Sequence, residues 1–117
     1  MGNKTGEIKD RVVMTLKIRE FHAGDHIHTE QTAVRYLQVA MEEADKAETS
    51  RQGAAIIADA LGEVARAQRH MSAIASDADR SRSGIYKALS NQGDPALSTV
   101  ISAVHAAGGS LTVTMAH

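Results

Sequence analysis

The chain has 117 residues, a length that fits one domain with one hydrophobic core; 43% of the residues are hydrophobic but only 3% are aromatic. It contains no cysteine, which excludes disulfide bonds and thiolate metal sites, and its net charge of −1 gives no overall basic excess. No apolar run is long enough to span a membrane and the N-terminus lacks the apolar stretch of a secretory signal, so we expect a cytoplasmic protein without a membrane partner.

The N-terminal residues are polar at first and then mixed. We expect residues 1–15 to be a disordered extension and residues 16–117 to form a single domain. Residues 12–21, VVMTLKIREF, combine β-branched and alternating side chains, which predicts a strand or an extended arm. Residues 22–28 are expected to form a loop.

A first helix is predicted from Thr29, a suitable N-cap, to about Asp45. Its apolar side chains recur at steps of three and four residues and form one stripe: Val34, Leu37, Met41 and Ala44. A second helix runs to about Gln68 and is expected to bury Ile57, Leu61 and Val64.

The start of this second helix stays open. Thr49 and Gln52 have the spacing of a capping box, which favours a start at residue 50, whereas Gly53 favours a later one.

Residues 71–89, MSAIASDADRSRSGIYKAL, predict two short helices joined by a tight turn. Ala75 is small enough for the two helices to cross steeply, and one core receives the apolar positions Ile74, Ala78, Ile85 and Ala88. Polar and basic residues then lie on or near the outer side of the second helix: Ser81, Arg82, Ser83, Tyr86 and Lys87. A helix with such a face fits the major groove of DNA.

A last helix is expected to open with Asp94 as N-cap and Pro95 at its first position, and to end at Gly108, because glycine tolerates the left-handed conformation. Its apolar stripe is Leu97, Val100, Ile101 and Val104. Residues 110–115, SLTVTM, alternate and predict a short C-terminal strand. Because a lone strand leaves backbone groups unpaired, it should pair with residues 12–21 or with its copy in a second subunit.

Charge is distributed unevenly along the chain. Residues 1–65 hold eight Lys and Arg against eleven Asp and Glu, whereas residues 66–117 hold five against three. The five basic residues all fall in residues 66–89: Arg66, Arg69, Arg80, Arg82 and Lys87. This segment is therefore suited to nucleic acid. The acidic residues Glu42, Glu43, Asp45 and Glu48 are suited to a basic protein partner or form a solvated face.

The candidate DNA-binding residues are Ser72, Arg80, Ser81, Arg82, Ser83, Tyr86 and Lys87. Arg82 and Lys87 carry long cationic donors for phosphate or guanine, and the Ser83 hydroxyl can reach a base edge or a phosphate. Ser81 is expected to cap its helix. Ser72, at the start of the first short helix, either caps that helix or contacts phosphate.

Tyr86 is open to two interpretations. Its phenol can bond a phosphate, and its ring can pack against the neighbouring helix.

No catalytic constellation is present, because the sequence lacks a phosphate-binding glycine loop, a nucleophile elbow and a nucleophilic cysteine. His22, His26 and His28 have spacing that could bind zinc, but they lie in a loop without a second pair of ligands. We therefore expect no metal, no cofactor and no enzymatic activity.

Three segments resemble the addiction-module antidote proteins: ALGEVARAQ (60–68), MSAIASDADRSRSGIYKALS (71–90) and DPALSTVISAVHAAGGSLTV (94–113). Residues 16–21 and 29–45 resemble the N-terminal part of the same family, so the resemblance covers nearly the whole chain.

The resemblance implies an all-α, phage-repressor-like fold of five helices, with a helix-turn-helix and the short C-terminal strand. It also implies a homodimeric antitoxin that neutralises a small basic toxin of the mRNA-cleaving type and represses its own operon by binding the operator DNA.

The sequence departs from the family pattern at several positions. Asp79-Arg80 replaces Gly-Leu in the turn; aspartate tolerates a left-handed turn, and Arg80 is expected to swing outward. Ala73 and Ser76 replace polar residues of the first short helix, and Gly84 weakens the second. Two alternatives therefore remain, a stand-alone regulator of a mobile element and a protein-binding module whose DNA-reading surface has decayed.

Overall fold

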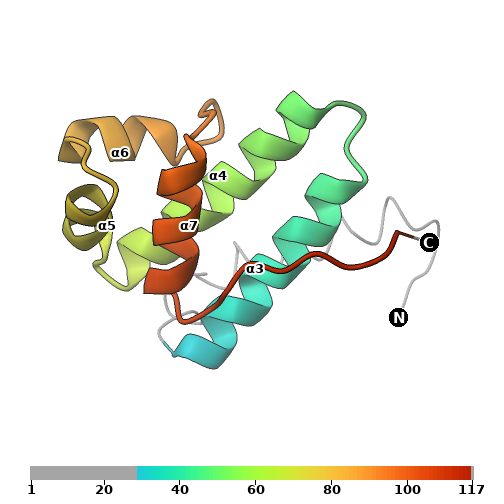
Figure 1. Cartoon of the computed structure of the whole chain (residues 1–117), viewed down its shortest axis with the longest axis horizontal. Coiled ribbons are helices and arrows are strands. Elements are labelled where there is room, and N and C mark those ends of the chain that lie inside the picture. The colour runs from blue at the N-terminus through green and yellow to red at the C-terminus, as the bar shows by residue number, and fades with distance from the viewer. Residues whose placement is uncertain (1–28, 117) are drawn as a thin grey trace.

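The structure is a computed structural model, and it describes residues 29–116. This part of the chain forms five helices and no strand (Figure 1): α3 (Glu30–Asp45), α4 (Ser50–Ala67), α5 (Met71–Asp77), α6 (Arg82–Ala88) and α7 (Leu97–Ala106). The predicted all-helical architecture of five helices is confirmed for these residues. The predicted extension at 1–15, the arm at 12–21 and the loop at 22–28 lie outside them.

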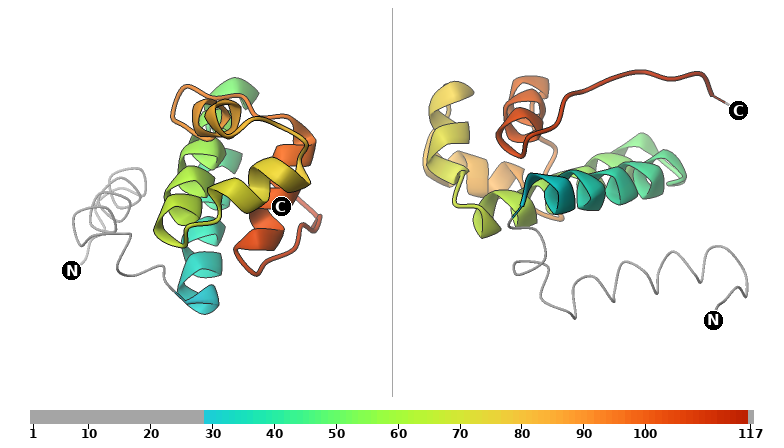
Figure 2. Two further views of the ribbon diagram at one scale, coloured as in Figure 1. Left: turned by 90° about the vertical axis from the view of Figure 1, so that its left-hand side faces the viewer. Right: turned by 90° about the horizontal axis from the view of Figure 1, so that it is seen from below.

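The long helices α3 and α4 run in opposite directions and lie side by side (Figures 1 and 2). The bounds predicted for α3 are confirmed, with Thr29 accepting a bond from the backbone N–H of Thr32. At α4 the earlier start is the right one. The Thr49 hydroxyl accepts from the Gln52 N–H at 3.1 Å, and the Gln52 side chain accepts from the Thr49 N–H at 3.2 Å.

Gly53 lies inside α4 and does not mark its start. It is there because α4 and the end of α3 are close together at this position. A Cβ atom there would lie 2.9 Å from the carbonyl oxygen of Ala44, so the missing side chain lets α4 approach the end of α3. The glycine marks a close contact between two helices and not the beginning of one.

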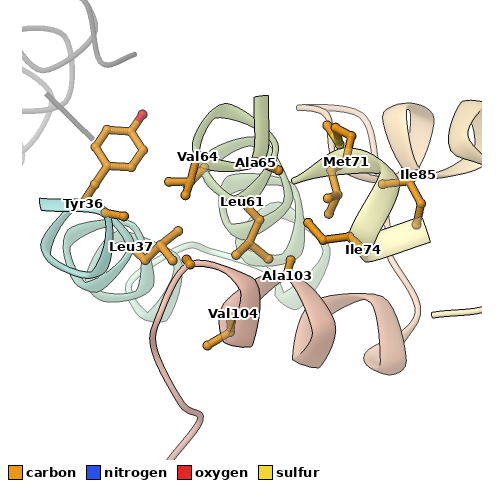
Figure 3. Close-up of a cluster of buried hydrophobic side chains, with 14 of the residues drawn as sticks. Tyr36, Leu37, Leu61, Val64, Ala65, Met71, Ile74, Ile85, Ala103 and Val104 are labelled. Carbon is orange, nitrogen blue, oxygen red and sulfur yellow. The ribbon is translucent and has the colours of Figure 1, made fainter. Parts of the chain in front are cut away.

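One hydrophobic core joins all five helices. Figure 3 shows Leu61 and Val64 of α4 lying between Leu37 of α3 and Ile74 of α5. Ile85 of α6 enters the same cluster and is 1% exposed. Helix α7 packs across α4 and α5. The short helices α5 and α6 thus pack at the C-terminal end of α4.

Three of the helices end in the same backbone motif, in which a left-handed residue follows the cap and the next N–H reaches back five residues. These N–H groups belong to His70, Arg80 and Gly109 and bond to the carbonyl oxygens of Ala65, Ala75 and Val104 at 2.8, 2.9 and 3.0 Å. The left-handed residues are Arg69, Asp79 and Gly108, with φ of +59°, +56° and +99°. The left-handed turn predicted at Asp79 and the glycine stop predicted at Gly108 are confirmed.

The predicted start of α7 is wrong. The helix begins at Leu97 with Ala96 as its cap, and neither Asp94 nor Pro95 belongs to it. Gly93 lies directly against the backbone of Ala88, so the chain is still turning away from α6 there, and residues 93–96 remain irregular.

The predicted apolar stripe of α7 is only partly right. Val104 is buried, but Leu97 is 70% and Ile101 is 37% exposed. The inward face carries mostly small side chains instead: Thr99, Ser102, Ala103 and Ala107. Small side chains let α7 approach its neighbours closely, and a prediction from hydrophobicity alone misses that constraint.

The predicted C-terminal strand is not seen. Residues 110–116 have no regular structure, and residues 29–116 contain no strand that could pair with them. Unpaired strand backbone does not form a ladder on its own, so the alternating sequence is left exposed here.

We expect Gly62→Ala to destabilise the fold by at least about 2 kcal/mol, because a Cβ atom on this buried residue of α4 would overlap the carbonyl oxygen of Leu89. This loss exceeds the roughly 1 kcal/mol that alanine gains over glycine within a helix. Urea denaturation followed by circular dichroism measures it.

Gly109→Ala is the matched control, because its Cβ would meet only ordinary contacts at 3.4 Å and beyond. It should change the free energy of unfolding by less than about 0.5 kcal/mol. Equal stability of the two variants would contradict the close packing of α4 against Leu89.

Candidate nucleic-acid interface

The start of α6 is set by one side chain. Ser81 has extended backbone, with φ −71° and ψ 155°, and its hydroxyl accepts from the N–H of Gly84 at 3.0 Å. The prediction that Ser81 caps this helix is confirmed. The cap fixes Arg82 as the first helical residue and so sets the register of the side chains that follow.

Helix α6 has one buried and one exposed side. Ile85 and the following Leu89 are fully buried, and they attach the helix to the core. The exposed residues include four of the predicted site residues: Arg82, Ser83, Tyr86 and Lys87. The Ser83 and Ser81 hydroxyl oxygens lie 3.4 Å apart.

Arg82 and Tyr86 interact one helical turn apart. The Arg82 Nη2 donates to the Tyr86 phenol oxygen at 3.5 Å, and the guanidinium carbon lies 5.7 Å from the ring centroid. Tyr86 is 39% exposed. It lines one hollow together with Met71 and Ser72 at the start of α5, and both interpretations of this residue stay predictions.

A hollow of about 390 Å³ opens beside this pair, and we call it the basic hollow. Three elements line it: the end of α4, the start of α5 and the exposed side of α6. Its lining residues are Arg66, Arg69, Met71, Ser72, Arg82 and Tyr86, and none of these six is acidic. Three arginines and two residues with hydroxyl groups thus line one hollow.

The remaining predicted site residues lie nearby. Ser72 is exposed in the first turn of α5, but it is not the cap; that position is held by His70, which makes no side-chain capping bond. Arg80 is exposed in the turn, as expected of a side chain that swings outward. Lys87 is exposed in the last turn of α6 and does not line the basic hollow.

Arg66 and Arg69 belong to the basic segment of the sequence but are not among the predicted site residues. Arg69 follows the end of α4 and Arg66 lies in its last turn, so neither belongs to the two short helices. Only the packing of three elements brings them next to Arg82. The available signal was the absence of acidic residues between 66 and 76.

The match to known proteins covers nearly the whole chain. Residues 17–115 match the sequence model of a family described as "Probable addiction module antidote protein". The chain belongs to this family. The resemblance noted in the sequence is thereby confirmed, and membership in the antidote family supports an antitoxin role and suggests a regulatory, non-enzymatic protein.

One relative of this chain is an uncharacterized protein of Haemophilus influenzae. It is 40% identical over 93 residues, which are 80% of this chain and 87% of the relative. No solved structure matches the chain.

The structure shows where the residues that depart from the family pattern lie. Ala73 and Ser76 are exposed on α5. A Cβ atom at Gly84 would lie 3.0 Å from the Ser81 oxygen that caps the helix, so the glycine leaves room for the cap.

Residues 29–116 contain no group of three or more side chains that could hold a metal ion, and His22, His26 and His28 lie outside them. Within the same residues no helix is both long and apolar enough to span a membrane.

We expect Ser81→Ala to destabilise the protein by about 1 kcal/mol, because the N–H of Gly84 loses its acceptor. Ser83→Ala is the control on the same helix; its hydroxyl accepts no capping bond, and its loss should cost less than about 0.5 kcal/mol. Thermal and urea denaturation measure both. Equal losses would show that Ser81 does not hold α6.

Proposed function

We propose that this antidote is a DNA-binding antitoxin that represses its own operon and neutralises a small basic toxin of the mRNA-cleaving type. The observation that carries the DNA-binding part is the exposed face of α6. Arg82, Ser83 and Lys87 are exposed on a helix whose other side is anchored by Ile85 and Leu89. The family match supports the toxin-binding part.

The proposed mechanism treats α5 and α6 as a helix-turn-helix. Helix α6 enters the major groove, where Arg82 and Lys87 neutralise phosphates or bond guanine, and Ser83 meets a base edge. Arg80 and Ser72 flank this face and contact the backbone. Ser81 acts indirectly, because its cap fixes where the helix starts.

We propose a homodimer, because one recognition helix covers too few base pairs for useful specificity. An operator with two-fold symmetry binds two copies of the helix more tightly than one. Exposed apolar side chains support a further interface: Leu97, Ile101, Leu111, Val113 and Met115. Sedimentation equilibrium should give twice the chain mass of 12.4 kDa at micromolar concentration. A mass of one chain under those conditions, with and without DNA, would contradict the dimer.

The proposed toxin surface lies at the opposite end of α4 from the basic residues. Glu42, Asp45 and Glu48 are exposed at the end of α3 and in the loop that follows. A run of exposed carboxylates suits a basic protein partner. The arm predicted at residues 12–21 remains a second candidate for this contact.

Replacing Arg82 and Lys87 together by alanine should abolish binding to the DNA upstream of the gene in a gel-shift titration. The physical reason is the loss of two exposed cations from the face that meets phosphate. Wild-type binding should weaken as salt rises. The double variant should still capture the protein encoded by the neighbouring gene in a co-expression pull-down.

Lys46→Ala with Arg51→Ala is the matched control, since it removes the same charge from exposed positions at the far end of α4. It should leave the gel shift unchanged. Absence of any wild-type retardation at low salt would favour the decayed module, and loss of toxin capture in the Arg82/Lys87 variant would show that the two surfaces are not separate. A stand-alone regulator would bind DNA but capture no neighbouring protein.

A further inference from the structure

The basic hollow has an electrostatic arrangement that the mechanism above does not use. Arg66 and Arg69 come from the end of α4, and Arg82 comes from α6, yet all three line one hollow of about 390 Å³. No acidic residue lines it. Three like charges held around one space repel one another, and an anion placed between them removes that repulsion.

The backbone at Arg69 gives a second, independent observation. Arg69 is left-handed, with φ +59°, at the position after the cap of α4. The motif that ends the helix requires this conformation, and glycine is the residue that adopts it without strain. Helix α7 ends in the same motif and has Gly108 there.

An arginine at this position therefore carries a conformational cost that a glycine would remove. Strained residues of this kind concentrate at functional sites, because stability alone would select another residue. What Arg69 supplies that glycine cannot is a cationic side chain, and Arg69 is one of the residues that line the basic hollow.

The hydroxyl groups of the hollow complete the set of donors. The Tyr86 phenol oxygen accepts a bond from Arg82, so its own hydrogen is available to donate elsewhere. Ser72 adds a second hydroxyl. Guanidinium forks with neighbouring hydroxyls match the oxygens of a phosphate better than those of a neutral ligand.

We propose that the basic hollow binds one phosphate of the DNA backbone, held by Arg66 and Arg69 together with Arg82 and Tyr86. This inference rests on the proposed function, because Arg82 belongs both to the hollow and to the exposed face of α6. A phosphate in the hollow lies at the edge of the groove that α6 enters. It fixes the position of the helix along the DNA without reading sequence.

Arg69→Gly separates this role from a structural one. The variant should melt at a higher temperature, by about 4 °C or more, because it removes the left-handed strain. It should also bind DNA at least about tenfold more weakly, because one charged donor pair is lost. The slope of log K against log salt should fall by about one.

The probe is a duplex of arbitrary sequence, titrated at several salt concentrations, since a phosphate contact weakens binding to all sequences alike. Arg51→Ala is the charge-matched control at the other end of the same helix and should leave affinity and slope unchanged. Arg69→Lys keeps one positive charge without the guanidinium fork, and its affinity should lie between those of the wild type and the glycine variant.

The outcomes separate this proposal from the one on which it rests. Wild-type retardation with an unchanged affinity and slope in Arg69→Gly would overturn the phosphate site and leave the reading by α6 standing. A fall in both melting temperature and affinity would make Arg69 structural and also overturn it. No retardation of any duplex by the wild type at low salt would remove the proposed function and, with it, this site.

A duplex RNA of the same sequence tests the source of the phosphate. It should bind more weakly, because the deep, narrow major groove of RNA does not admit α6. Equal or tighter binding of the RNA, with the same loss in Arg69→Gly, would assign the hollow to RNA and overturn its assignment to DNA.

Discussion

The attachment of α6 to the core is the constraint on which the proposed interface depends. A helix of seven residues is not stable alone, because the cost of starting a helix is spread over too few bonds. Two buried side chains hold α6, Ile85 within it and Leu89 just after it. The close approach of Gly62 to the Leu89 backbone brings α4 against the end of the same helix. The exposed cations are therefore held in place by contacts on the other side of α6.

Three helices end in the same left-handed turn, but the residue at the left-handed position differs from one helix to the next. The left-handed residues at 69, 79 and 108 each end a helix and change the direction of the chain. Gly108 does this without strain, and Asp79 does it at small cost, because aspartate tolerates this conformation. Arg69 combines the turn with a cationic side chain. The backbone motif is thus the same at all three helix ends, and the side chain at its left-handed position is what differs.

Local signals made much of the fold predictable. The bounds of α3, the cap at Ser81 and the left-handed Asp79 all follow from a few neighbouring residues, and all are confirmed. The capping box at Thr49 was equally visible, but Gly53 competed with it. That glycine is needed because it lies close to the backbone of Ala44 on another helix, and a pattern along the sequence does not show such a contact.

What escaped prediction depends on contacts between elements. The stripe predicted on α7 depends on hydrophobicity alone, but the packing of the helix buries the smaller Ala103 and Thr99 and leaves Leu97 exposed. The C-terminal segment alternates like a strand but has no partner strand within residues 29–116. The basic hollow needs three elements in register, so Arg66 could be counted as a charge but not placed.

Helix α4 also separates the two surfaces that the proposed function requires. It has 18 residues, which at 1.5 Å per residue makes it about 27 Å long. The acidic residues Asp45 and Glu48 come just before its first turn, and the basic hollow begins at its last turn. This distance exceeds the Debye length of about 8 Å at physiological salt, so the exposed charges of the two surfaces are largely screened from each other. Under the proposed function, a basic toxin and DNA bind near opposite ends of one helix, and coupling between them would run through α4 or through the proposed dimer.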